Sequence, residues 1–197
     1  MEVGWKQIWA LYGWKELLSK RNKLFYFSVS ASLIAIITLN IAKSSTFKLI
    51  ENLANISNSI MPTLLGFNLG AYALIIGFLS NKRLLEALVK KDDTSRFDRL
   101  QKISGVFAMN IIVQAFTLLC SFLIKIFIDL EISSFDFSLY NKQASDIFNI
   151  IIFFLIFFFT LYSVVLLIQN AINIFDFSQL FSHFATREEN TIEKQDE

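Results

Sequence analysis

Residues 147–168, IFNIIIFFLIFFFTLYSVVLLI, decide the fold of this chain because they form a long block without a single charged side chain. An α-helix rises about 1.5 Å per residue, and the hydrocarbon core of a bilayer is about 30 Å thick, so roughly 20 apolar residues are needed to cross it. This block meets that length. It is therefore predicted to cross a membrane as one helix.

Three further apolar blocks of membrane-spanning length lie at residues 24–42, 62–80 and 103–128. The composition agrees, since 54% of the 197 residues are hydrophobic, 22 are Phe and one is Pro. Strands are excluded because open sheet edges cannot be satisfied in lipid, and the alternation of a barrel is absent. The predicted fold class is all-α, an integral membrane four-helix bundle that extends over residues 24–184.

The basic residues near the ends of the four blocks predict the orientation. Five Lys and Arg residues precede the first block and seven lie between the second and third, against three in the two remaining loops. Loops rich in Lys and Arg stay on the cytoplasmic side. We therefore expect a multi-pass protein of the cell inner membrane with its N-terminus, its C-terminus and its central segment, residues 81–102, in the cytoplasm.

Residues 1–23 are predicted to form an interfacial amphipathic helix. Trp5, Ile8, Trp9 and Tyr12 share one helical face, and a cluster of Lys and Arg follows them. Aromatic residues beside basic ones are typical of a helix that lies in the headgroup layer. Two alternatives stay open: an aromatic anchor that only fixes the first span, and a signal peptide cleaved near Ala42.

Apolar residues also continue beyond the cytoplasmic ends of the second and fourth blocks. Leu84, Leu85 and Leu88 share a helical face in the central segment, and a Phe-rich pattern follows residue 168 as far as Phe184. These patterns predict amphipathic helical extensions that pack on each other or bind a partner protein. The charged residues 185–197 have no apolar face and are predicted to be mobile.

Small residues recur along the second block at Gly66, Gly70, Ala73 and Gly77. Two membrane helices gain no hydrophobic free energy from meeting each other, so close contact between them depends on small residues and interhelical hydrogen bonds. We interpret this stripe as a helix-packing seam that supports self-association. A pore lining or a ligand groove is the alternative interpretation.

Intramembrane amides form a second pattern. Asn68 lies beside the stripe of small residues, and Asn110 and Gln114 share one face of the third block. Counting from the cytoplasmic ends places Asn68 roughly 18 Å deep and Gln114 roughly 16 Å deep, so we expect these two amides to form a hydrogen bond. The alternative is a hydrated polar path that would add Thr117 and three serines of the first block, Ser28, Ser30 and Ser32.

Charged and reactive residues argue against catalysis. Lys125 is the one charge well inside a predicted span, and we expect it to reach the headgroups beside Asp129. No span has a buried carboxylate, which disfavours a proton-coupled carrier. Phosphate-loop, zinc-protease and nucleophile-elbow motifs are absent. A single Cys120, a single His183 and a net charge of +1 favour neither a metal site, nor a cofactor, nor a nucleic-acid partner.

Residues 61–73, MPTLLGFNLGAYA, resemble a span of small bacterial inner-membrane proteins. Some of those proteins are membrane components of anti-phage defence systems of the Kiwa type or of systems associated with retrons. The resemblance implies an inner-membrane protein that acts with a soluble partner and either senses disturbance of the envelope or permeabilises it.

The sequence thus leads to two functional hypotheses. The first is a non-enzymatic membrane subunit that self-associates through its second span and recruits or signals to a cytoplasmic partner, since its outer loops are short and its inner elements are larger and carry apolar faces. The second is a homo-oligomeric pore that permeabilises the membrane. Both hypotheses expect the lipid bilayer and further copies of the chain as partners.

Overall fold

The computed structural model describes residues 22–42, 45–79, 99–130 and 142–196, together with Lys6 and Ile8. These residues form four helices, α3 Lys23–Ala42, α4 Thr46–Phe78, α6 Arg99–Asp129 and α7 Lys142–Asp196. Side chains on α7 are described as far as Ser182. The predicted interfacial helix and most of the central segment lie outside the described residues.

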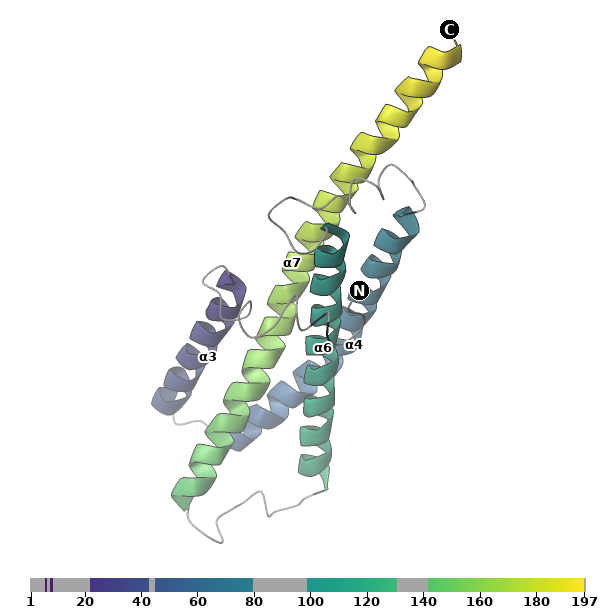
Figure 1. Ribbon diagram of the computed structural model, residues 1–197. Helices are drawn as coiled ribbons and strands as arrows, with labels where there is room; N and C mark the ends of the chain where they lie inside the picture. Colours follow the sequence, from purple (N-terminus) through teal and green to yellow (C-terminus); the bar gives the residue numbers. More distant parts are fainter. Residues whose placement is uncertain are drawn as a thin grey trace.

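Three of the helices form the body of the structure. α4, α6 and α7 pack against one another, and α3 packs against α7 (Figure 1). The N-terminal ends of α3 and α6 lie at the same end of the bundle as the C-terminal ends of α4 and α7 (Figure 1). α7 has 55 residues and projects past the other helices at that end (Figure 1).

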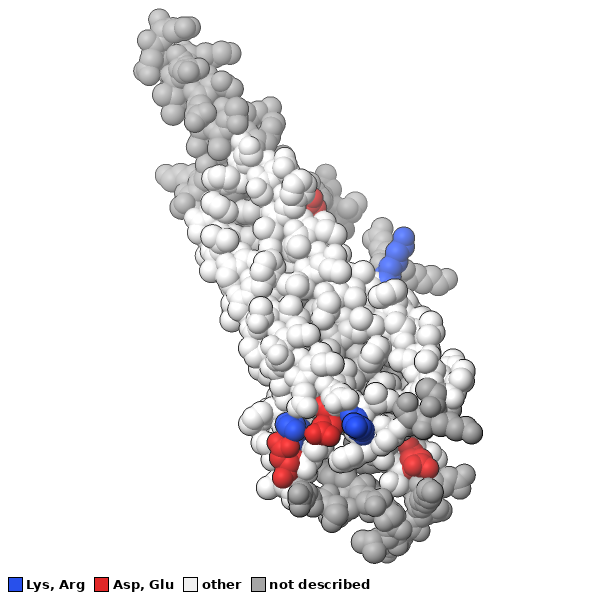
Figure 2. Space-filling view, turned by 180° about the vertical axis from the view of Figure 1, so that it is seen from behind, with Lys and Arg blue, Asp and Glu red and all other residues white. Residues whose placement is uncertain are grey.

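The described helices have the length and surface of membrane-crossing segments. Three of them are long and apolar enough to span a membrane, over Thr46–Phe78, Leu100–Asp129 and Ser145–Ser182. α3 is a shorter apolar helix of 20 residues. Figure 2 shows the charged side chains gathered towards the two ends, with an uncharged surface between them. The all-helical fold is confirmed, with three helices of spanning length.

α4 differs from the predicted second span, which covered residues 62–80. The helix begins at Thr46 and carries Pro62 in its interior. Proline lacks a backbone N–H and is unfavourable inside a helix, so the residues before Pro62 were predicted to form an outer loop. They instead bury one continuous face with three- and four-residue spacing, formed by Ile50, Ala54, Ser57 and Met61. Packing of this face keeps the chain helical through Pro62, and the ribbon bends in its lower part (Figure 1).

α7 also extends further than predicted. The fourth predicted span ended at residue 168 with an extension to residue 184, whereas the helix continues to Asp196. The mobility expected of residues 185–197 stays a prediction. Arg, Glu, Lys and Gln have high intrinsic helix propensity. Adding residues to an existing helix also avoids the cost of nucleation. The charged end of the chain is therefore an extension of the longest helix.

Apolar clusters close both ends of the bundle. The upper cluster, towards the C-terminal end of α4 and the N-terminal end of α6, contains Ala71, Ile75, Phe107 and Phe177. The lower cluster contains Leu39, Ile50 and Phe153. A third cluster joins α3 to α7, where Phe25 makes edge-on contacts with Phe158 and Tyr162 at ring-centroid distances of 5.6 and 5.9 Å. Edge-to-face contacts of this kind favour one docking geometry.

Phe177 and Phe175 offer a matched test of the upper cluster. The side chain of Phe177 is 4% exposed, and that of Phe175, two residues earlier on α7, is 63% exposed. We expect Phe177→Ala to lower the free energy of unfolding by about 3–5 kcal/mol, because a cavity is left beside Phe107. Phe175→Ala should cost less than about 0.5 kcal/mol. Reversible unfolding of detergent-solubilised protein in SDS measures both values, and equal losses would contradict the packing described.

Candidate functional site

Buried polar side chains form a continuous column, here called the polar ladder, between α4, α6 and α7. All but one of its members are at most 8% exposed. Asn58 is half-buried. The ladder consists of Ser57, Asn58 and Asn68 from α4, Asn110, Gln114, Thr117 and Ser121 from α6, and Thr160, Ser163 and Asn170 from α7. Because its members span ten to eleven residues of each helix, it is about 15 Å long.

Asn68 is the central member of the ladder because it joins all three helices. Its Nδ2 donates a hydrogen bond of 2.7 Å to Oε1 of Gln114 on α6. Its Oδ1 accepts a hydrogen bond of 2.9 Å from Nδ2 of Asn170 on α7. The predicted bond between Asn68 and Gln114 is thus confirmed, and one amide side chain sets the relative height of three helices.

The remaining amides on α6 reach the backbone of α7. Nε2 of Gln114 donates to the carbonyl oxygen of Ser163, and Nδ2 of Asn110 donates to that of Leu166, each over 3.4 Å. Backbone carbonyls of a helix already accept one bond, so these are second, longer contacts. They still require α6 and α7 to keep one register.

Hydroxyl groups occupy the lower half of the ladder. The Thr117 hydroxyl donates to the carbonyl oxygen of Val113 over 2.7 Å and lies 3.2 Å from Oγ of Ser163. Further down, Oγ1 of Thr160 donates to Oγ of Ser57 over 3.2 Å. Nδ2 of Asn58 donates to the carbonyl oxygen of Ser121 over 3.4 Å. Each of these levels adds a contact between α4, α6 and α7.

Three atoms of the ladder stay without a partner among the described residues: Oδ1 of Asn58, Oγ of Ser121 and Oδ1 of Asn170. The upper and lower apolar clusters cover the ends of the ladder. All members of the ladder are amides or hydroxyls, and none is an ionisable side chain. The chemistry of the ladder is that of hydrogen bonding between helices, where removal of one member leaves its partners unsatisfied in an apolar environment.

The predicted alternative was a hydrated path that combines the intramembrane amides and Thr117 with the serines of α3. In the structure the serines of α3 do not join the other members of this path. Ser28 and Ser32 are buried, but each hydroxyl donates to the carbonyl oxygen four residues earlier, at Leu24 and Ser28, over 3.0 and 2.7 Å. Ser30 is exposed. Local bonding of this kind satisfies a hydroxyl inside its own helix. These serines therefore provide a small contact surface on α3, while Thr117 belongs to the ladder.

The stripe of small residues faces away from the bundle. Gly66, Gly70, Ala73 and Gly77 are exposed, and no atom of another element lies within 4 Å of a Cβ built on the three glycines. A helix turns about 100° per residue, so the stripe lies on the side of α4 opposite Asn68. Asn68 was expected to lie beside the stripe, but the two lie on opposite faces of α4. The stripe forms no seam with any of the four described helices, and contact with a second copy stays a prediction.

Lys125 lies where the sequence predicted, beside the acidic end of α6. Its Nζ is 2.8 Å from Oδ1 of Asp129 and 3.6 Å from Oε1 of Glu51 on α4. The contact with Asp129 confirms the expected pair. Glu51 was missed because its segment was predicted to be a loop rather than the first turns of α4. The second carboxylate ties the lower ends of α4 and α6 together.

Six of the ten residues of the ladder escaped sequence reasoning, although a signal was present. Ile156, Thr160, Ser163, Asn170 and Phe177 follow one another on α7 at intervals of four, three, seven and seven residues. This spacing places them on one helical face. Asn170 lay beyond the predicted end of the fourth span, and the hydroxyls of Thr160 and Ser163 were read as ordinary residues of an apolar block.

No protein family, characterised protein or solved structure matches this chain. Within the described residues, no group of three His, Cys, Asp or Glu side chains is arranged to hold a metal ion. The polar ladder and the projecting end of α7 are thus the features from which a function must be argued.

A double-mutant cycle tests the central bond of the ladder. We expect Asn68→Leu and Gln114→Leu each to lower the free energy of unfolding by about 1–3 kcal/mol, because each leaves a buried amide unpaired. Their coupling energy should be about 0.6–1.7 kcal/mol, the range found for hydrogen bonds between membrane helices. The control is Thr63→Val, at an exposed site on α4, which should change the free energy of unfolding very little. A coupling energy of zero in SDS unfolding would show that the bond does not stabilise the fold.

Proposed function

We propose that this chain is a non-enzymatic subunit of the cell inner membrane that crosses the bilayer four times, self-associates, and presents the cytoplasmic end of α7 to a partner protein. The observation that carries the proposal is α7 itself. One uninterrupted helix contributes to the polar ladder inside the apolar band and projects beyond the other helices at its C-terminal end (Figure 1). A movement of the bundle would therefore reach the projecting end directly.

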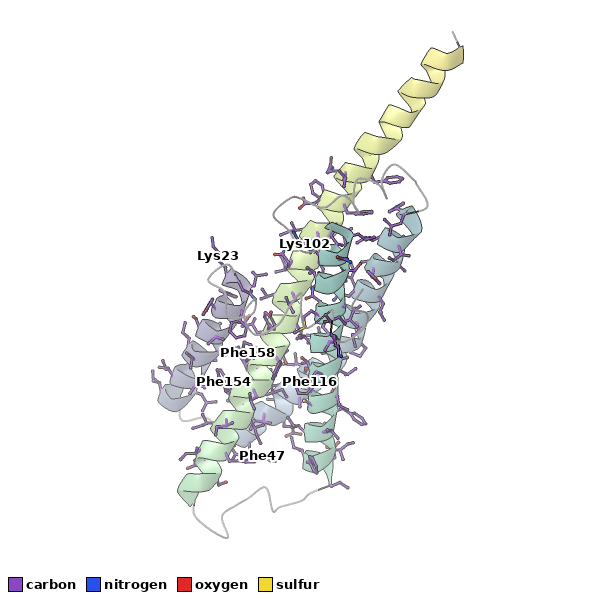
Figure 3. The ribbon with its side chains drawn as sticks, in the orientation of Figure 1. Lys23, Phe47, Lys102, Phe116, Phe154 and Phe158 are labelled. Atoms are coloured by element: carbon purple, nitrogen blue, oxygen red, sulfur yellow. The ribbon has the colours of Figure 1, made fainter. Side chains whose placement is uncertain are left out.

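The arrangement of charged ends supports four crossings with both termini in the cytoplasm. Lys23 at the start of α3 and Lys102 near the start of α6 lie at the same end of the bundle (Figure 3). The projecting part of α7 lies at that end as well. Basic residues favour the cytoplasmic side, so this end is the cytoplasmic one. α3 has 20 residues, enough for about 30 Å of bilayer, and serves as the fourth crossing.

Self-association is supported by the exposed stripe on α4. Gly66, Gly70, Ala73 and Gly77 present backbone rather than bulky side chains to the surroundings of the bundle. Small residues at such spacing let two membrane helices approach closely. The stripe lies opposite the ladder, so a second copy can pack on α4 without disturbing the contacts inside the chain. A role in anti-phage defence is supported by the resemblance of residues 61–73, which include this stripe as far as Ala73.

The alternative function, a homo-oligomeric pore, draws its support from the length of the polar ladder. Two observations weigh against it: ladder residues of α4, α6 and α7 bond to each other, and apolar clusters lie towards both ends of the bundle. A conducting path would require the helices to separate. The signalling role needs no such opening, and it is the function we prefer.

Gly70→Leu tests the self-association interface. We expect the substitution to weaken association between copies by roughly tenfold or more in membranes, because the added side chain prevents close approach of two α4 helices. The fold of each copy should persist, since the position faces open space. Phe67→Leu, at an exposed position beside the stripe, should leave association unchanged. Energy transfer between fluorescently labelled copies in vesicles gives both values, and equal association of all three proteins would refute the interface.

Removal of the residues after Ser182 tests the role of the projecting helix. We expect the shortened protein to stay in membranes after a carbonate wash but to lose a cytoplasmic protein that the full-length chain retains in crosslinked pull-downs. The upper cluster remains in the shortened chain, because Phe177 and Phe181 precede the cut. Recovery of the same partner by both forms would contradict the proposed role of this end, and release by carbonate would contradict membrane insertion.

A further inference from the structure

A furrow runs along the junction of α6 and α7 on the surface of the apolar band. Its main part has a volume of about 160 Å³, and its walls include Cys120 and Ile124 from α6 and Leu155 and Ile156 from α7. Phe116, labelled in Figure 3, meets Phe159 across the upper end of the furrow with ring centroids 5.3 Å apart. These two residues are the lining residues nearest the middle of the bundle on α6 and α7.

The furrow continues to the charged end of the bundle. A smaller hollow of about 30 Å³ shares Ile124 and Ile152 with the main part. Its other lining residues come from all three helices: Phe47 and Ile50 from α4, Phe127 and Ile128 from α6, and Asn149 from α7. Twelve residues separate Ile128 from Phe116, so the whole furrow is about 18 Å long. Lys125, which pairs with Asp129 and Glu51, lies on α6 between Ile124 and Ile128, two lining residues of the smaller hollow.

The walls of the main part require an apolar occupant. Thr117 supplies the one hydroxyl among the lining residues, and that hydroxyl is already bonded to the carbonyl oxygen of Val113 and close to Oγ of Ser163. A water molecule needs two to four polar partners in order to be held. Carbon atoms form nearly all of the remaining lining, so a hydrocarbon suits the furrow and water does not.

We propose that this furrow holds one acyl chain of a bilayer phospholipid, with the headgroup at the level of Lys125. The proposal rests on the membrane insertion proposed above. One leaflet contributes about half of a 30 Å hydrocarbon core, so an extended acyl chain matches a furrow of about 18 Å that begins at the charged end and stops inside the band. The groups of both signs in the ion pairs of Lys125 suit a zwitterionic headgroup.

Native mass spectrometry of the full-length chain, extracted from membranes in a mild detergent, tests this site. Leu155→Trp fills the furrow from α7 and Cys120→Trp fills it from α6. Leu123→Trp is the matched control, because Leu123 is 44% exposed outside the furrow and Leu155 is 45% exposed within it. We expect the parent and the control to retain a phospholipid adduct. The two filled variants should show roughly tenfold less of this adduct, or less still.

Equal adducts in all four proteins would overturn the proposal, as would an equal loss in the control. A change in dimer content at Leu155→Trp with the adduct intact would assign the furrow to a second copy and overturn it too. Helix content measured by circular dichroism shows whether a variant has unfolded. If one of the two filled variants has unfolded, the adduct of the other one tests the proposal. A parent protein that stays in membranes without an adduct refutes the furrow alone, whereas a parent absent from membranes refutes the proposed function.

Discussion

The hydrogen bonds of Asn68 are the constraint on which the rest of this structure depends. In lipid, two apolar helix surfaces gain little by meeting, because the lipid chains are equally apolar. Many large apolar side chains of this protein are exposed, so apolar burial alone cannot specify which helices are neighbours. An amide that bonds to Gln114 on α6 and to Asn170 on α7 does specify it. A displacement of α4 by one turn would break both bonds, and a displacement of α6 or of α7 would break one of them.

The ladder and the apolar clusters have different roles along the bundle. Polar contacts near the middle fix the register of α4, α6 and α7, while the clusters around Phe107 and Phe153 pack the two ends. α7 contributes to the ladder and to both end clusters, and its aromatic residues also pack against α3. The same helix continues to Asp196 at the end where Lys23 and Lys102 lie. α7 is thereby the element that links the apolar band with the projecting end of the chain.

Sequence reasoning succeeded where a signal depended on composition or on short spacing. The apolar blocks predicted helices, the depths of Asn68 and Gln114 predicted their bond, and the four-residue spacing predicted the pair of Lys125 and Asp129. It did not succeed where packing overrides a local rule. Pro62 lies inside a helix because the residues before it bury a continuous face, and Glu51 reaches Lys125 only because of that helix. The outward direction of the Gly70 stripe depends on which face of α4 the other helices cover.

Placement of the polar ladder inside a bilayer requires the two ends of α6 to lie on opposite sides of the membrane. Single cysteines at Lys102 and Leu130, introduced separately in a Cys120→Ala background, report this directly through labelling with a membrane-impermeant maleimide. The account predicts that Leu130→Cys is labelled in intact cells and that Lys102→Cys is labelled only after the membrane is permeabilised. Labelling of both positions from the same side would contradict it.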